Sequence, residues 1–194
     1  MSKVTWKGGA LIAPLPAVMV TCGTMEKSNA LTIGWTGITN TVPPKTYISV
    51  RPERYSHDII KQSMCFVINL TTSDMVKAVD YCGVRSGKNE DKLAKMNLSV
   101  EKANTIDCPM LEKSPVSIEC KVTDIISMGS HDMFLADITA VNVDEKYIDK
   151  NGKLDLQRCS LLAYAHGEYF KLGEKIGSFG FSVKKPAKKR KKTK

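Results

Sequence analysis

Asn29-Ala30-Leu31-Thr32-Ile33-Gly34-Trp35-Thr36-Gly37 opens the most informative stretch of the chain. It continues through Ser49-Val50-Arg51-Pro52-Glu53-Arg54-Tyr55-Ser56 and closes at Phe66-Val67-Ile68-Asn69. Small hydroxyls, an amide, an indole and an arginine interrupt strand-like segments at their ends. These groups suit a ligand with a flat, polar-edged ring and a phosphate. We therefore interpret the stretch as part of a flavin site.

The surrounding chain predicts a mainly β fold with short helices. Runs of apolar or alternating residues predict strands at 17–22, 31–36, 47–51, 64–70, 116–123, 133–143, 161–165 and 168–172. Helices are expected only at 57–63, 74–81 and 90–96. Many short strands separated by short helices argue against a doubly wound sheet. They favour a closed or partly open antiparallel barrel, which removes exposed strand edges.

Length and cysteine usage restrict the class of protein. The 194 residues are enough for one domain, which we place at 1–183. No apolar run approaches the roughly 20 residues of a membrane span, and no signal peptide is recognised, so we expect a cytoplasmic protein. The six cysteines contain no Cys-x-x-Cys pair and no zinc-like spacing, so no metal is expected. Free, mostly buried thiols are the favoured interpretation, with a redox dithiol as the alternative.

The net charge of +9 is concentrated at one end of the chain. Residues 184–194 hold eight of the 29 basic residues and no acid, which leaves 21 basic against 20 acidic residues in the body. Such a segment cannot form a core, and we expect it to be a disordered tail. A solvated tail without a specific partner is favoured over one that makes non-specific contacts with polyanions.

Several sequence motifs are absent, and their absence narrows the chemistry. No dinucleotide-binding Gly-x-Gly-x-x-Gly, phosphate-binding Gly-x-x-x-x-Gly-Lys-Ser/Thr or hydrolase Gly-x-Ser-x-Gly motif occurs. Redox chemistry, if the chain performs it, therefore has to come from a bound cofactor. We assign no catalytic side chain.

Lys92 and Ser56 are each open to two interpretations. Lys92 falls in the first turn of an expected helix, where the helix dipole disfavours a cation by about 0.3–1 kcal/mol. A docked anion would reverse that penalty, but the side chain can also extend into water. Ser56 is either the N-cap of the helix at 57–63 or a phosphate ligand. Arg51 and Arg54 either bind a phosphate or pair with Glu53 or Asp58.

Three ring-bearing residues also have a structural alternative. His131 follows a Gly-Ser turn and can lie at the mouth of a site, although a lone histidine is more often structural. Trp35 and Tyr164 can each cover a flavin ring, and each is more often plain core.

The order of these elements resembles the flavin reductase-like family, and within it the flavoredoxins. The similarity covers about residues 10–182 and excludes the tail. It rests on Asn29-x-x-Thr32-x-x-Trp35, Ser49-Val50-Arg51, Tyr55-Ser56, Ser86-Gly87 with Lys92, Gly129-Ser130-His131, and Tyr164. The resemblance implies an FMN-binding split β-barrel, a homodimer with the flavin near the subunit interface. It implies these cofactor-binding residues: Asn29, Ala30, Leu31, Thr32, Trp35, Thr36, Ser49, Val50, Arg51, Tyr55, Ser56, Ser86, Gly87, Lys92, His131 and Tyr164.

Two positions depart from the family pattern. Ser56 stands where a threonine is usual, and Tyr164 where a phenylalanine is often found. The implied function is an FMN-dependent oxidoreductase that receives electrons from NAD(P)H or a small redox protein. The alternatives are an FMN electron carrier without enzymatic activity, and a polyanion-binding protein that acts through its tail.

Overall fold

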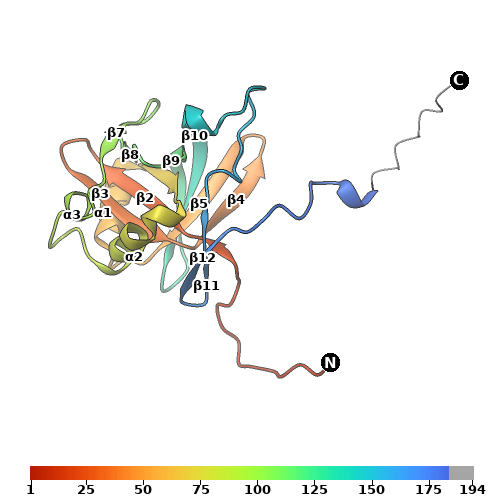
Figure 1. Cartoon of the computed structure of the whole chain (residues 1–194). Coiled ribbons are helices and arrows are strands. Elements are labelled where there is room, and N and C mark those ends of the chain that lie inside the picture. The colour runs from red at the N-terminus through yellow and green to blue at the C-terminus, as the bar shows by residue number, and fades with distance from the viewer. Residues whose placement is uncertain (184–194) are drawn as a thin grey trace, which may run out of the picture.

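The computed structural model describes residues 1–183, which are built around one seven-stranded antiparallel sheet (Figure 1). Its strand order is β3-β2-β6-β9-β10-β5-β4. The bounds are β2 Val18–Gly23, β3 Ser28–Ile33, β4 Thr36–Thr41, β5 Pro44–Val50, β6 Cys65–Leu70, β9 Val116–Ser127 and β10 Asp132–Val143. The predicted mainly β, antiparallel architecture is confirmed.

The sheet curls so that its two edges approach each other beside Trp35. Trp35 lies between the end of β3 and the start of β4, the two edge strands. Its carbonyl oxygen accepts a hydrogen bond of 3.0 Å from the backbone nitrogen of Ser49 in β5. This hydrogen bond continues the pairing of β4 with β5, in which Thr36 lies opposite Ile48, by one residue.

Two small sheets and several short helices cover the barrel. One sheet contains β1 Leu15–Pro16, β11 Leu162–Ala165 and β12 Glu168–Lys171, and the other pairs β7 Val100–Lys102 with β8 Pro109–Leu111. The helices are α1 Tyr55–Ser63, α2 Val76–Val84 and α3 Lys92–Lys95, with 3-10 turns η1 Ser73–Met75, η2 Glu145–Tyr147 and η3 Phe181–Val183. None of these described helices is long and apolar enough to cross a membrane.

The apolar side chains separate into packed clusters that follow the sheet. The barrel interior is filled by alternate residues of the main strands, among them Phe66 and Phe134, both fully buried. A second cluster joins β2 and β3 to α2 and β11, with Met19 and Val79 at its centre. Because α2 is held against β3, its end is fixed beside the polar residues of that edge strand.

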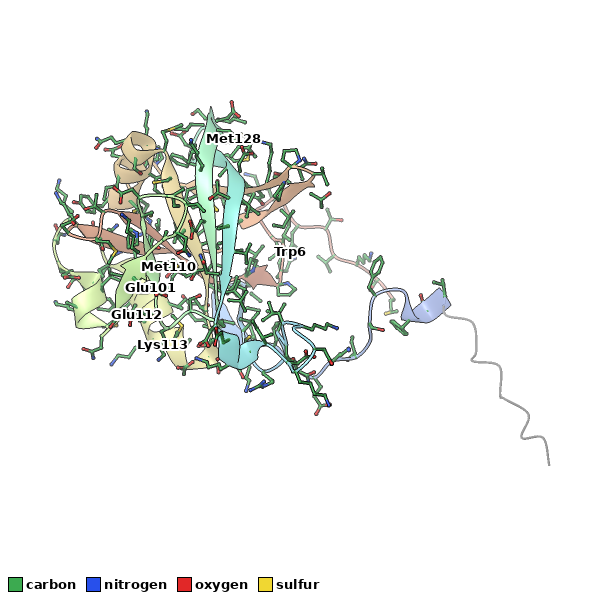
Figure 2. The ribbon with its side chains drawn as sticks, turned by 90° about the horizontal axis from the view of Figure 1, so that it is seen from above. Trp6, Glu101, Met110, Glu112, Lys113 and Met128 are labelled. Carbon is green, nitrogen blue, oxygen red and sulfur yellow. The ribbon has the colours of Figure 1, made fainter. Side chains whose placement is uncertain are left out.

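The long β9–β10 hairpin shows where simple alternation fails. Its strands are antiparallel and its tip carries Met128, as Figure 2 shows. Alternation along β9 would place Glu119 on the solvent face with Lys121, but Glu119 is fully buried. Its carboxylate accepts hydrogen bonds from the backbone nitrogens of Asn104 and Thr105 at 2.8 and 2.7 Å. The loop between β7 and β8 covers this part of the sheet, so the outward face is not solvent here.

Three expected element boundaries were wrong. α1 begins at Tyr55 with Arg54 as its N-cap, so Ser56 lies inside the first turn and does not cap the helix. The strand expected at 31–36 lies instead at Ser28–Ile33, because the chain bends at Gly34 before β4. The helix expected at 90–96 is the single turn α3. The basic segment 184–194 lies outside the described residues.

Candidate functional site

Asn29 joins the edge strand β3 to helix α1. Its Nδ2 donates a hydrogen bond of 2.6 Å to Oγ of Ser56, and both side chains are buried. The two residues are 27 positions apart in the chain. Ser56 therefore uses its hydroxyl to hold Asn29.

Gly87 is the residue against which Asn29 is packed from the other side. A β-carbon built on Gly87 would overlap Oδ1 of Asn29 and lie 3.2 Å from Cδ1 of Tyr55. No side chain larger than hydrogen fits without displacing these neighbours. The backbone of the 86–88 segment is consequently brought close to β3 and α1 at this point.

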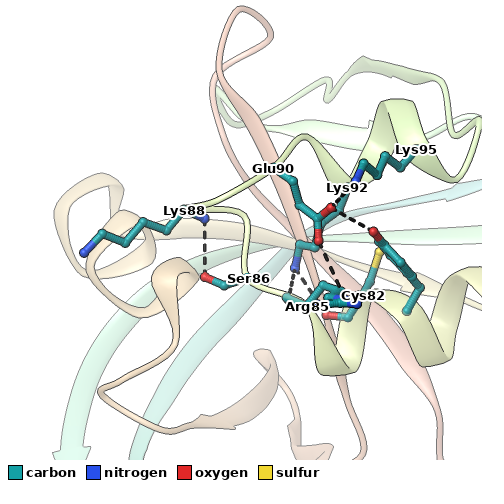
Figure 3. A network of polar contacts seen from close by, with 8 residues as sticks. Cys82, Arg85, Ser86, Lys88, Glu90, Lys92 and Lys95 are labelled. Atoms are coloured by element: carbon teal, nitrogen blue, oxygen red, sulfur yellow. Dashed lines mark hydrogen bonds and ion pairs between the residues drawn. The ribbon is translucent and has the colours of Figure 1, made fainter.

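Lys92 is buried, so the expectation that its side chain extends into water was wrong. Only 4% of the residue is exposed. Its Nζ donates to the carbonyl oxygens of Cys82 and Arg85, each at 3.2 Å, as Figure 3 shows. These carbonyls belong to the end of α2, where the helix dipole favours a cation. The favourable dipole at Lys92 is therefore that of α2, and the one-turn α3 contributes little.

The ammonium of Lys92 nevertheless lacks a direct anionic partner among the described residues. An ammonium has three N–H donors, and the two carbonyls account for two of them. Burial lowers the pKa of Lys92, since removing water disfavours the charged form. The neighbouring Glu90 is already engaged by Lys95 at 2.6 Å and by the Tyr81 hydroxyl at 2.8 Å (Figure 3).

A cavity of about 510 Å³ brings together four of the expected cofactor-binding residues. Its walls include Asn29 from β3, Tyr55 from α1, Gly87 and Lys92. They come from separate parts of the chain and supply an amide, an aromatic face, a close backbone and a buried cation. The wall is polar, the cavity has a size suited to part of a nucleotide, and its other charged lining residues are Glu26, Lys27, Glu90 and Asp91.

A second cavity, of about 340 Å³, lies beside the end of α2. Its lining includes Thr32, Trp35 and Tyr164, together with Arg54 and Gly83. Tyr164 is only partly buried, and 42% of Trp35 is exposed, so neither is simply core. The two aromatic side chains provide flat apolar surface on this cavity.

His131 packs on Trp35, which lines the second cavity. The centroids of their rings are 4.6 Å apart with an interplanar angle of 33°. Partial burial lowers the pKa of His131, and the nearby positive charge of Arg51 lowers it further. The neutral imidazole is thus favoured near pH 7, with one ring nitrogen as donor and the other as acceptor.

Six of the remaining expected residues fall into three sets. Thr36 and Ser49 line a smaller cavity of about 280 Å³ together with Trp35. Ala30, Leu31 and Val50 direct their side chains into the apolar clusters, so only their backbone groups are available to a ligand. Ser86 is exposed, and its hydroxyl accepts a 3.3 Å hydrogen bond from the Lys88 backbone.

Arg51 and Arg54 make no ion pair with Glu53 or Asp58 among the described residues. Sequence reasoning missed Gly83 and Tyr169, both of which line the second cavity. Tyr169 packs edge-on against Tyr164 with ring centroids 5.5 Å apart. The sequence marks Gly83 only as the end of a helix and not as a cavity residue. No sequence pattern identifies Tyr169, because its position beside Tyr164 depends on the pairing of β11 with β12.

Comparisons with known proteins identify the family and the fold. The family model for the flavin reductase like domain matches residues 12–173. The structure of flavoredoxin from Desulfovibrio vulgaris (Miyazaki F) has a TM-score of 0.88 and 27% identity over 94% of this chain and 100% of that one. The structure of flavoredoxin from Methanosarcina acetivorans has a TM-score of 0.86 and 25% identity, over 95% of this chain and 100% of that one. An FMN-binding protein from Thermus thermophilus shares the fold, with a TM-score of 0.76 and 22% identity over 92% of this chain and 99% of that one.

Proposed function

The chain belongs to the flavin reductase-like family and has its split-barrel fold, and we propose that it is an FMN-binding oxidoreductase. A flavin-associated redox function follows from the family, while FMN as the particular cofactor and the residues that bind it are part of the proposal. The buried ammonium of Lys92 is the observation that carries it. A lysine in this environment, with a donor remaining and no described carboxylate in contact, calls for an anion such as a phosphate.

The residues present fit a flavin mononucleotide in two parts. Lys92 would bind the phosphate, and the close approach of Gly87 to Asn29 leaves backbone groups of the same wall open to it. Trp35 and Tyr164 offer ring-sized apolar surface on the neighbouring cavity. Arg54 lines that second cavity, and after burial its positive charge also lowers the pKa of Lys92.

Bound FMN would supply the redox chemistry by accepting and passing on a hydride or electrons. The chain's own residues would bind and orient it. Asn29 is fixed by Ser56, so its amide is held in one orientation. His131, held against Trp35, would place a polar ring nitrogen at the edge of the site. A donor near the pyrimidine edge of a flavin raises its reduction potential, because the reduced ring gains negative charge there.

Flavin binding tests the proposal directly. Titration of the purified protein with FMN, followed by its visible spectrum and fluorescence, is expected to show saturable binding. Riboflavin, which lacks the phosphate, should bind more weakly. A folded protein that binds neither flavin would overturn the proposed function.

The enzyme and the carrier differ in their electron donor. We favour a reductase that accepts hydride from NADH or NADPH, and anaerobic mixing should then bleach the bound FMN rapidly. Reduction by ferredoxin or thioredoxin, without bleaching by either pyridine nucleotide, would instead identify an electron carrier. The two outcomes separate the hypotheses without any variant.

A homodimer is also part of the proposal. Two extended arms leave the barrel, as Figure 1 shows, and both carry exposed apolar side chains. The N-terminal arm presents Trp6 and Ile12, and the C-terminal arm presents Ile176 and Phe179. Exposed apolar surface of this kind is typical of an interface. Light scattering coupled to size exclusion should give twice the monomer mass; a monomer would contradict this part.

A further inference from the structure

Cys65 and Cys108 form a pair of thiols that the proposed flavin chemistry does not use. Cys65 is the first residue of β6, and Cys108 immediately precedes β8. Both side chains belong to the same packed cluster, which also contains Val67, Ala103 and Met110. The pair lies at the junction between the barrel and the β7–β8 hairpin. The two cysteines are 43 positions apart in the chain, so they form no Cys-x-x-Cys motif that could be recognised in the sequence.

The two thiols differ in their access to solvent. Cys65 lines a cavity of about 700 Å³ whose walls also include Tyr55, Asp107 and Lys121. Cys108 is only 1% exposed and does not line that cavity. Its thiol lies 3.5 Å from the backbone oxygen of Thr21. A small molecule entering the cavity would meet Cys65 first, with Cys108 behind it.

Cys65 is the more acidic of the two thiols, and it lies against the segment that carries Cys108, with its Sγ 3.7 Å from the backbone oxygen of Asp107. The neighbouring Cys108 side chain lowers the pKa of Cys65 to about 7, against the opposing effect of burial. Proximity to Cys65 and burial raise the pKa of Cys108. Near neutral pH a substantial fraction of Cys65 is therefore the thiolate, which is the nucleophilic form.

We propose that Cys65 and Cys108 are a redox-active pair that hydrogen peroxide converts into a disulfide. In the first step the Cys65 thiolate attacks one peroxide oxygen. An S–O bond forms, the O–O bond breaks, and the departing hydroxide takes up a proton to become water. In the second step the Cys108 sulfur attacks the Cys65 sulfenic acid, an S–S bond forms, and its S–O bond breaks with loss of a second water. Two thiols lose two electrons in total, and one peroxide is reduced to two waters.

The other thiols near the pair do not compete for this role. Cys22 and Cys120 are both fully buried. Burial raises the pKa of Cys22 to about 12 and also raises that of Cys120. Cys159 is buried away from the cluster and is the matched control. This site is independent of the proposed cofactor site, although Tyr55 borders both cavities.

The test uses the full-length protein, treated with hydrogen peroxide and then denatured and alkylated. The expected result is loss of two alkylatable thiols, reversed by dithiothreitol. Tryptic mapping should join peptide 62–77, which contains Cys65, to peptide 103–113, which contains Cys108. Equal alkylation of all six cysteines before and after peroxide, or a cross-link through another pair, would overturn the proposal.

Two variants separate the roles of the two thiols. Cys108→Ser should stop at the sulfenic acid of Cys65, which dimedone traps as an adduct on peptide 62–77. Cys65→Ser should give neither the adduct nor the cross-link, whereas Cys159→Ser should behave as the natural protein. On the untreated natural protein at pH 7, iodoacetamide should modify Cys65 first, a result that does not depend on the folding of any variant. Faster labelling of another cysteine would contradict the assignment.

Discussion

The side-chain amide of Asn29 donates its hydrogen bond to the hydroxyl of Ser56, at 2.6 Å, across the contact between β3 and α1. This one bond accounts for the burial of both groups. It also gives the Ser56 hydroxyl a third role, which is neither that of a helix N-cap nor that of a direct phosphate ligand. Ser56 orients the amide, and the amide forms part of the cavity wall that contains Lys92.

Replacing Ser56 should therefore destabilise the fold. Ser56→Ala leaves the Nδ2 group of Asn29 buried without its acceptor, which should cost about 1–3 kcal/mol of unfolding free energy. Urea denaturation of the flavin-free protein measures the change. Ser99→Ala, which removes an exposed hydroxyl, should stay within about 0.5 kcal/mol of the natural protein. Equal stabilities of the two variants would show that the bond contributes nothing.

Replacing Lys92 should separate cofactor binding from stability. Lys92→Met keeps the apolar stem and removes the buried charge, so the flavin-free protein should be at least as resistant to heat as before. Loss of a charge-assisted hydrogen bond of about 1.5–3 kcal/mol should weaken FMN binding by about 10- to 150-fold. Fluorescence titration measures both flavins, and riboflavin binding should change much less. An equal loss for riboflavin would place the phosphate elsewhere.

Gly87 should tolerate no side chain. Gly87→Ala places a methyl group against Oδ1 of Asn29, which forces the amide or the 86–88 segment to move. Overpacking of this kind should cost about 1–3 kcal/mol in FMN binding or in stability. Calorimetric titration with FMN gives the first quantity and thermal unfolding the second. Gly173→Ala, where a β-carbon meets nothing within 4 Å, is the matched control and should leave both unchanged.

His131 should contribute to the pH dependence of stability. Its pKa in the folded protein is lowered from 6.5 by burial, so the unfolded chain binds the proton more readily. His131 therefore makes its full contribution to the free energy of unfolding above pH 6.5, the ordinary value. This contribution is lost as the pH falls from there towards the pKa of the folded protein. NMR titration of the imidazole follows the group directly. Arg51→Gln removes a nearby positive charge and should raise the midpoint, while Arg158→Gln, in the turn at 156–160, should not move it, because Arg158 is not among the charges that act on His131.

The sequence was sufficient for the parts of the fold that depend on local pattern. Alternation of apolar residues predicted the strands of the β9–β10 hairpin, and the apolar run at 64–70 predicted the strand β6, which the structure buries on both faces. The free, buried cysteines were predicted from composition and spacing. These features are local because strand periodicity and turn chemistry act over a few residues.

Local pattern failed where distant segments meet. Glu119 alternates correctly for a solvent-facing residue, yet the loop after β7 covers it and supplies backbone donors. Lys92 has a long side chain that normally reaches water, but the end of α2 lies over it and provides two carbonyl acceptors. No nearby residue signals either contact, because each depends on how separate elements pack.

By itself, the sequence determined the antiparallel β architecture, the family, and the order of the polar residues that we propose as cofactor ligands. Only the tertiary structure decided that Asn29 is held by Ser56, that Gly87 packs against Asn29, and that Cys65 and Cys108 lie in one packed cluster. The physical reason is the distance along the chain over which each interaction acts. Side-chain periodicity is set by the backbone of a few neighbouring residues, whereas burial, desolvation and hydrogen-bond partners are set by whichever distant segment packs against them.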